Sequence, residues 1–108
     1  MVEDVYQVVF SRNAKQDLRK IVSYLGKKTS ISIEQKVRKG ILDQAEGLQK
    51  LPESKPILQG IEGLEYEVRY AKAWSYKIIF RIFHPTNTVR ILAIRHDKED
   101  PENMISKL

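Results

Sequence analysis

The chain has 108 residues, of which 42% are apolar and 31% charged, with a formal net charge of +5, a composition that predicts one globular domain rather than a disordered tail. It has no cysteine, which excludes a disulfide framework, a thiolate nucleophile and a cysteine metal site, and two histidines are too few for a convincing zinc cluster. The N-terminal residues include acids where a signal peptide needs positive charge, and no apolar run could span a bilayer, so we expect a cytoplasmic protein without metal or cofactor.

The first half of the chain predicts one strand and two helices. Residues 5–10 are β-branched and aromatic, which is typical of a strand. Ser11 can cap a helix whose apolar residues recur at three- and four-residue spacing, and Gly26 is the expected end of that helix. A second helix is expected to begin near Ser32 and to close at Leu51-Pro52. The short connection between the helices predicts an antiparallel hairpin.

The second half predicts a sheet. After a loop rich in proline and glycine, strands are expected at residues 65–71, 74–83 and 88–96. In the middle strand, alternation places Trp74 and Phe80 on a core face and Lys77 and Arg81 on the other. We therefore predict a single α+β domain, residues 1–108, of order β-α-α-β-β-β. Its helical hairpin would pack on one face of an antiparallel sheet and leave the other face partly open.

Positive charge is concentrated in residues 66–98. Seven Lys or Arg there face only Glu67 and Asp97, which gives +5, the net charge of the whole chain. Such a segment indicates a surface for a polyanion, or for an acidic protein that blocks access to one. The residues expected to bind phosphate or another polyanion are Arg69, Lys77, Arg81, Arg95 and Lys98. Arg69 is expected on the open face because its neighbours in the strand would point inward.

Four segments together resemble the RelE/ParE superfamily of toxins from bacterial type II toxin–antitoxin modules. They are VVFSRNAKQDLRKIVSYL, residues 44–52, YEVRYAKAWSYKIIFRIF and VRILAIRHDKEDPE, and they span nearly the whole chain. The resemblance implies a growth-arresting toxin of a plasmid-stabilisation module with the βααβββ fold. It also implies a cognate antitoxin that wraps the toxin in a hetero-oligomer, and carboxylates of that antitoxin could cover Lys77 and Arg81.

The superfamily divides by target, and the sequence slightly favours the ParE-like branch, which inhibits DNA gyrase. The alternative is a RelE-like, metal-independent endoribonuclease that cuts messenger RNA in the ribosome. In that case the resemblance implies catalytic roles for Glu53, Arg69 and His96. The turn after the last strand reads RHDKEDP and no tyrosine follows Tyr76, which fits the ParE-like ending better. A weaker alternative is a basic nucleic-acid-binding module without chemistry.

Structural roles compete with each functional role. His96 could simply close a strand, Glu53 could be a solvated carboxylate, and His84 lies in a turn where no catalytic role is expected. Trp74 is expected in the core. Asp17 is expected on the solvated surface of the first helix, together with the basic residues around it.

Overall fold

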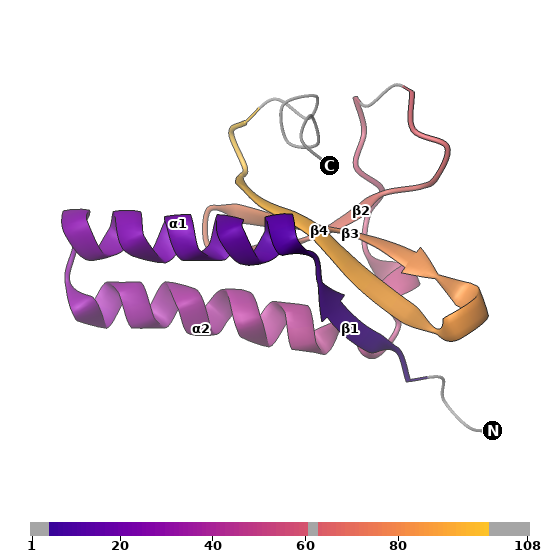
Figure 1. Cartoon of the computed structure of the whole chain (residues 1–108), viewed down its shortest axis with the longest axis horizontal. Helices are drawn as coiled ribbons and strands as arrows, with labels where there is room; N and C mark the ends of the chain where they lie inside the picture. The colour runs from indigo at the N-terminus through magenta and orange to yellow at the C-terminus, as the bar shows by residue number, and fades with distance from the viewer. Residues whose placement is uncertain (1–4, 61–62, 100–108) are drawn as a thin grey trace.

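The computed structural model describes residues 5–60 and 63–99 and confirms the predicted order of elements. The helices and strands are β1 (Gln7–Phe10), α1 (Arg12–Lys28), α2 (Ile31–Gly47), β2 (Arg69–Ala73), β3 (Tyr76–Phe83) and β4 (Thr88–His96). Short 3-10 helices lie at Pro52–Ser54 and His84–Thr86. Figure 1 shows the two helices as a long hairpin that extends beyond the twisted sheet.

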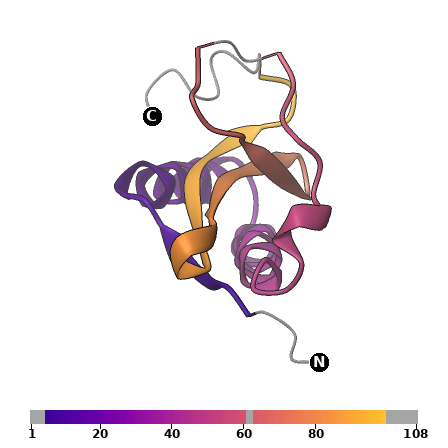
Figure 2. The same cartoon turned by 90° about the vertical axis from the view of Figure 1, so that its right-hand side faces the viewer.

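The sheet is mixed, with strand order β1-β4-β3-β2. The three later strands are antiparallel to one another, as expected, whereas β1 pairs parallel with β4. The expectation of a wholly antiparallel sheet is therefore wrong for β1. β1 and β4 are far apart in sequence, so no tight turn has to join them. The long connection between them, which includes the helical hairpin, can return β4 alongside β1 in the parallel direction (Figure 2).

Both helices start at a serine cap. The side chain of Ser11 accepts a hydrogen bond from the Ala14 N–H, which confirms the predicted start of α1, whereas α2 is capped by Ser30 and not by Ser32. Gly26 does not end α1, which continues to Lys28. A Cβ at Gly26 would lie 2.6 Å from a Glu34 carboxylate oxygen, the end of a flexible side chain on α2 that could move away.

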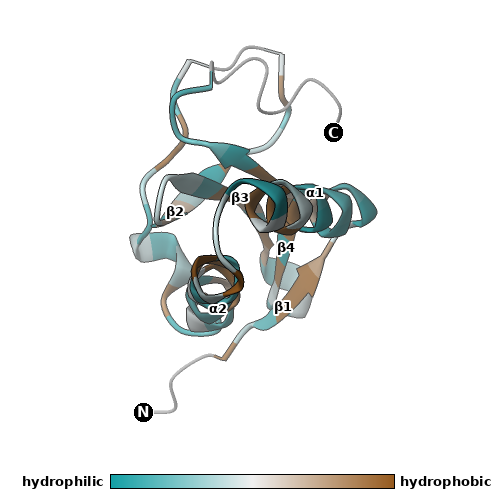
Figure 3. Ribbon diagram, turned by 90° about the vertical axis from the view of Figure 1, so that its left-hand side faces the viewer, coloured by the Kyte–Doolittle hydropathy of each residue, from teal (hydrophilic) through white to brown (hydrophobic). Residues whose placement is uncertain are grey.

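The core has two layers because both faces of the sheet are apolar. The layer under the helices contains Ile41, Leu48, Ile78 and Phe80, each fully buried. The layer on the other face is built by the segment between α2 and β2, and its buried members are Leu58, Val68, Ile79, Leu92 and Ala93. This segment covers part of the face that the sequence was expected to leave open. Figure 3 shows the helices end-on beside the sheet.

Trp74 lies outside the core, contrary to expectation. Its side chain is 60% exposed at the tip of the β2–β3 hairpin, where its φ of 56° is in the left-handed region. The indole contacts α2 at Gly40, because a Cβ built on that glycine would lie 2.6 Å from the indole Nε1. Phe80, by contrast, is fully buried as predicted.

Helix α1 closes the edge of β4 that the short strand β1 leaves unpaired. β1 ends opposite Ile91, and beyond that point the Ser11 hydroxyl donates to the Leu92 carbonyl at 3.1 Å. The Asp17 carboxylate then accepts the Ile94 N–H at 3.0 Å and lies 3.6 Å from the Arg95 Nε. The Asp17 side chain is only 11% exposed, so its expected place on the solvated helix surface is wrong. Side chains of α1 thus complete the backbone pairing of β4.

Within the described residues, no helix is long and apolar enough to cross a membrane. Among the same residues, no three His, Cys, Asp or Glu side chains are grouped in a way that could hold a metal ion. The expected end of the ParE-like signature, at Asp100 and Pro101, lies outside the described residues.

Candidate functional site

Arg69 lies on the helix-facing side of the sheet, not on the open face with Lys77 and Arg81. Its cross-strand partner is Phe80, and its neighbour Tyr70 pairs with Ile79 in the second core layer. The expectation failed because Val68 and Tyr70 do point into a core, but into the layer on the other face. Alternation cannot choose between two apolar faces of one sheet.

The guanidinium of Arg69 is already bonded within the chain. Its Nη1 donates to the Lys55 carbonyl at 2.6 Å, and its Nη2 donates to Glu67 Oε1 at 2.7 Å. The side chain is 19% exposed. Arg69 thus ties β2 to the segment before it, and an incoming anion would have to compete with the Glu67 carboxylate.

A pocket of about 240 Å³ beside Arg69 brings together side chains from distant parts of the chain. Glu53 and His84 line it, and the buried Tyr6 lies behind them. The Tyr6 hydroxyl donates to Glu53 Oε1 at 2.5 Å and lies 3.5 Å from His84 Nδ1. The hydrogen bond from Tyr6 is the main cause that lowers the pKa of Glu53, and His84 and Arg69 lower it further. Glu53 is therefore an exposed carboxylate, one oxygen of which is held by the buried Tyr6.

Sequence reasoning did not assign Tyr6 or His84 to a site. Tyr6 contacts Glu53 across 47 residues and His84 across 78 residues, so no local spacing could have shown the cluster. The two 3-10 turns, Pro52–Ser54 and His84–Thr86, carry Glu53 and His84, and each begins with or contains a proline that fixes the backbone there. A proline next to a titratable residue in each of two separate loops was the available signal.

His96 lies away from this pocket. It ends β4 opposite Tyr76, whereas Arg69 is opposite Phe80, four positions further along β3, so the two differ by about 13 Å along the strand direction. The His96 Nδ1 accepts the Lys98 N–H at 3.2 Å and lies 3.4 Å from Asp97. Of the three residues expected to act together in a nuclease, Glu53 and Arg69 share a pocket and His96 does not.

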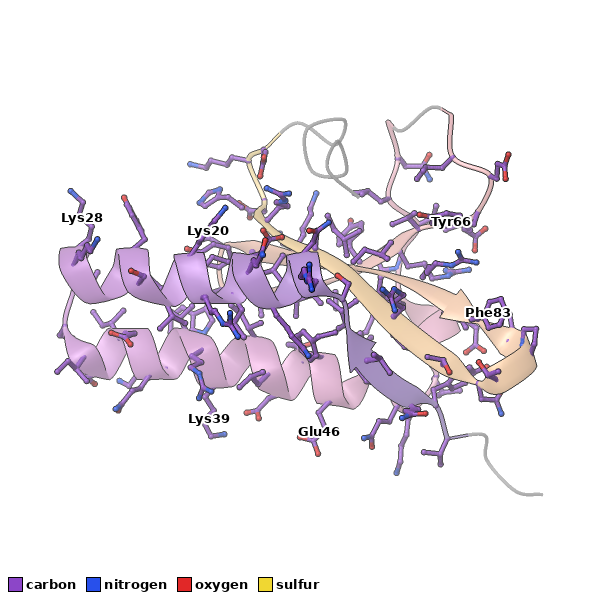
Figure 4. All side chains as sticks on the ribbon, viewed as in Figure 1. Lys20, Lys28, Lys39, Glu46, Tyr66 and Phe83 are labelled. Atoms are coloured by element: carbon purple, nitrogen blue, oxygen red, sulfur yellow. The ribbon has the colours of Figure 1, made fainter. Side chains whose placement is uncertain are left out.

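The other predicted cations are dispersed over the sheet. Lys77 lies over the Tyr70 ring at 4.7 Å, Arg95 is paired with Asp17, and Lys98 is exposed beyond the end of β4. Arg81 lies in a separate pocket of about 250 Å³, against the Tyr66 ring. In Figure 4, Tyr66 lies above the sheet, within the segment between α2 and β2, and Phe83 lies at the far end of β3.

Arg90 also lines the pocket of Arg81, although it was not predicted to be a site residue. In the sequence, Arg90 contributed only to the count of positive charges in residues 66–98. The register of β3 and β4, which places Arg90 directly opposite Arg81, is what reveals it.

Comparison with protein families gives a match to the model described as the ParE toxin of type II toxin–antitoxin systems, parDE, over residues 8–101. No curated protein matches the sequence.

Solved structures show the same fold at low identity. The chromosomal ParDE toxin–antitoxin system of P. aeruginosa is 20% identical with a TM-score of 0.69, and the match covers 86% of this chain and 97% of that one. The toxin–antitoxin complex RelBE2 of Mycobacterium tuberculosis is 21% identical with a TM-score of 0.60, covering 85% and 98%. A double arginine-to-alanine mutant of E. coli toxin RelE in the free state is 16% identical with a TM-score of 0.62, covering 95% and 96%.

Proposed function

The chain belongs to the ParE toxin family of type II toxin–antitoxin systems, and from this premise we propose that it arrests bacterial growth by inhibiting DNA gyrase. A cognate antitoxin would neutralise it in a hetero-oligomer. Solved relatives of the same fold are toxin–antitoxin complexes, which supports such a partner.

The observation that supports gyrase over messenger RNA is the separation of the expected nuclease residues. Cutting RNA without a metal requires a base, an acid and cations around one phosphate. His96 is distant from Glu53, and the Arg69 guanidinium is bonded to Glu67 and to the Lys55 carbonyl. A contact surface for another protein does not need these groups to converge.

A second candidate, a RelE-like ribosome-dependent endoribonuclease, is favoured by one feature of the pocket. Glu53, Arg69 and His84 line the same cavity, so a carboxylate with a lowered pKa, a guanidinium and an imidazole could face one phosphate. In this function His84 would take the role that the sequence analysis gave to His96. Substitutions of His84 and of His96 can therefore distinguish the two candidate functions.

The test is induction of the chain in bacteria that lack its antitoxin, with labelled precursors of DNA and of protein added together. The gyrase proposal expects DNA synthesis to stop first, and purified chain should inhibit supercoiling by gyrase. If protein synthesis stops first and ribosome-bound transcripts are cut, the nuclease candidate replaces it. Normal growth with folded chain present would contradict both and leave a binding module without chemistry.

The same substitution at two positions gives a matched control. Under the gyrase proposal, His84→Gln and His96→Gln should both retain toxicity, provided that circular dichroism shows the wild-type fold. Under the nuclease candidate, His84→Gln should lower cleavage by about 10²-fold or more, and His96→Gln should not. Loss of cleavage in His96→Gln alone would restore the role first assigned to His96.

A further inference from the structure

Arg81 and Arg90 face each other across β3 and β4 without a carboxylate between them. They are direct cross-strand partners, so their Cβ atoms are about 5 Å apart, and like charges in that position are destabilising. In the described part of the chain, neither forms an ion pair, whereas Arg69 has Glu67 and Arg95 has Asp17. Among the described residues, acids thus pair with two of the strand arginines and leave this adjacent pair unneutralised.

The guanidinium of Arg81 is held in a fixed position. It lies 4.0 Å from the centroid of the Tyr66 ring and 5.8 Å from that of Phe83. Its Nε is buried and has no hydrogen-bond partner in the described structure. A buried N–H without a partner costs free energy, and a guanidinium immobilised against an aromatic ring loses little further entropy when it binds an anion. The part of Arg81 that lines the pocket is therefore held in place for an acceptor that the described residues do not supply, whereas its buried Nε is closed to a ligand.

The pocket in front of this pair also receives the N-terminus of α1. Ser11 and Asn13 line it together with Leu92, and the first turn of the helix contains no acidic residue. The Ser11 hydroxyl is already engaged with Ala14 and Leu92, so the contribution of the helix is its N-terminal dipole rather than that hydroxyl. This pole is equivalent to about half a positive charge.

We propose that the pocket formed by Arg81, Arg90 and the N-terminus of α1 binds a terminal phosphate group, carried by a nucleotide or by the end of an oligonucleotide. Two guanidinium groups and the helix pole supply about 2.5 positive charges, which matches the −1.5 to −2 of a phosphate monoester better than the −1 of a carboxylate. Arginine forks also fit phosphate oxygens in bidentate geometry. Arg81 already lies over the Tyr66 ring, so we expect the phosphate itself, rather than a base, to be recognised.

The first experiment is an NMR titration of the full-length, ¹⁵N-labelled chain with inorganic phosphate at constant ionic strength. The Arg81 Nε–H signal should shift and saturate. Arg81→Gln and Arg90→Gln should each weaken binding by about tenfold or more, because each removes a charge-assisted contact. Arg38→Gln, which removes the same charge from the exposed surface of α2, is the matched control and should bind like wild type.

The source of the phosphate is distinguished by comparing a 5′-phosphorylated oligonucleotide, the same oligonucleotide with a 5′-hydroxyl, and a nucleoside 5′-monophosphate. Binding of both phosphorylated probes but not of the 5′-hydroxyl one supports the proposal, and their relative affinity identifies the carrier. Equal binding of the two oligonucleotides would overturn it in favour of general backbone attraction. A glutamate-rich peptide that displaces phosphate at lower concentration would overturn it in favour of a carboxylate. Arg90 is exposed, so its variant should fold even if Arg81→Gln does not.

Discussion

Replacing Asp17 with alanine should strongly destabilise the fold, because this one carboxylate serves two groups at the edge of β4. It accepts the N–H of Ile94, a residue that is 2% exposed, and it lies 3.6 Å from the Arg95 Nε, whose side chain is 18% exposed. Leaving the buried N–H unpaired costs about 1–3 kcal/mol. Losing a partly buried ion pair adds roughly 1 kcal/mol.

The expected loss is therefore about 2–4 kcal/mol, a large part of the stability of a small domain. With a denaturant slope of about 1.5 kcal/mol/M, the urea midpoint of the purified chain should fall by roughly 1–3 M. Asp17→Asn keeps an oxygen that can accept the Ile94 N–H and loses only the charge, so its midpoint should lie between those of wild type and Asp17→Ala.

Asp43→Ala is the control, because it also removes an aspartate from a helix. Asp43 pairs with Lys39 on the exposed surface of α2, and its loss should leave the midpoint unchanged within error. If Asp17→Ala unfolds at the same urea concentration as Asp43→Ala, the edge of β4 does not depend on α1 and the reasoning is wrong.

Three further predictions follow from single contacts. Tyr6→Phe removes the main cause of the lowered Glu53 pKa. The stabilisation from this hydrogen bond is present above the unfolded pKa of about 4.5 and is lost as pH falls through the lower folded pKa. In urea unfolding, the variant should therefore be less stable than wild type at pH 7, and the difference should shrink as pH falls below about 4.5. A stability difference that is constant with pH would contradict this. Gly40→Ala should displace the indole of Trp74, the chain's single tryptophan, and change the near-ultraviolet circular dichroism. Its stability should change little, because the better helix propensity of alanine offsets the lost contact. An unchanged spectrum would contradict the contact between Gly40 and the indole. Ser11→Ala should cost about 1–2 kcal/mol in thermal unfolding because a helix cap and a bond to β4 are lost together, and an unchanged midpoint would mean that water replaces the hydroxyl.

Local patterns in the sequence were sufficient for the order of elements, because helix and strand periodicities are properties of short segments. The cap at Ser11 and the inward position of Phe80 were predicted for the same reason. Asp17 was misplaced because its helix spacing is that of a solvated residue, and only the tertiary structure brings an unpaired strand edge beside it.

The candidate sites were predicted less well than the fold. Arg69 was assigned to the wrong face because the chain covers both faces of its sheet with apolar residues. The pairing of Glu53 with Tyr6 and the alignment of Arg81 with Arg90 both depend on contacts between segments, and a single sequence does not encode these in any short window. The composition of residues 66–98 predicted where the excess positive charge lies. It could not predict which of the arginines there are paired with an acid and which are not.

The position of β4 has a consequence for how the protein is made. This strand is the last described element of the chain, yet it lies inside the sheet, with β1 on one side and β3 on the other. A ribosome releases the chain from its N-terminus, so β1 remains an unpaired edge until β4 has been synthesised. The sheet can close only after β4 leaves the ribosome, and a product truncated before residue 88 should not fold. The folded sheet should therefore appear only once β4 has been synthesised, and not progressively as the earlier strands emerge.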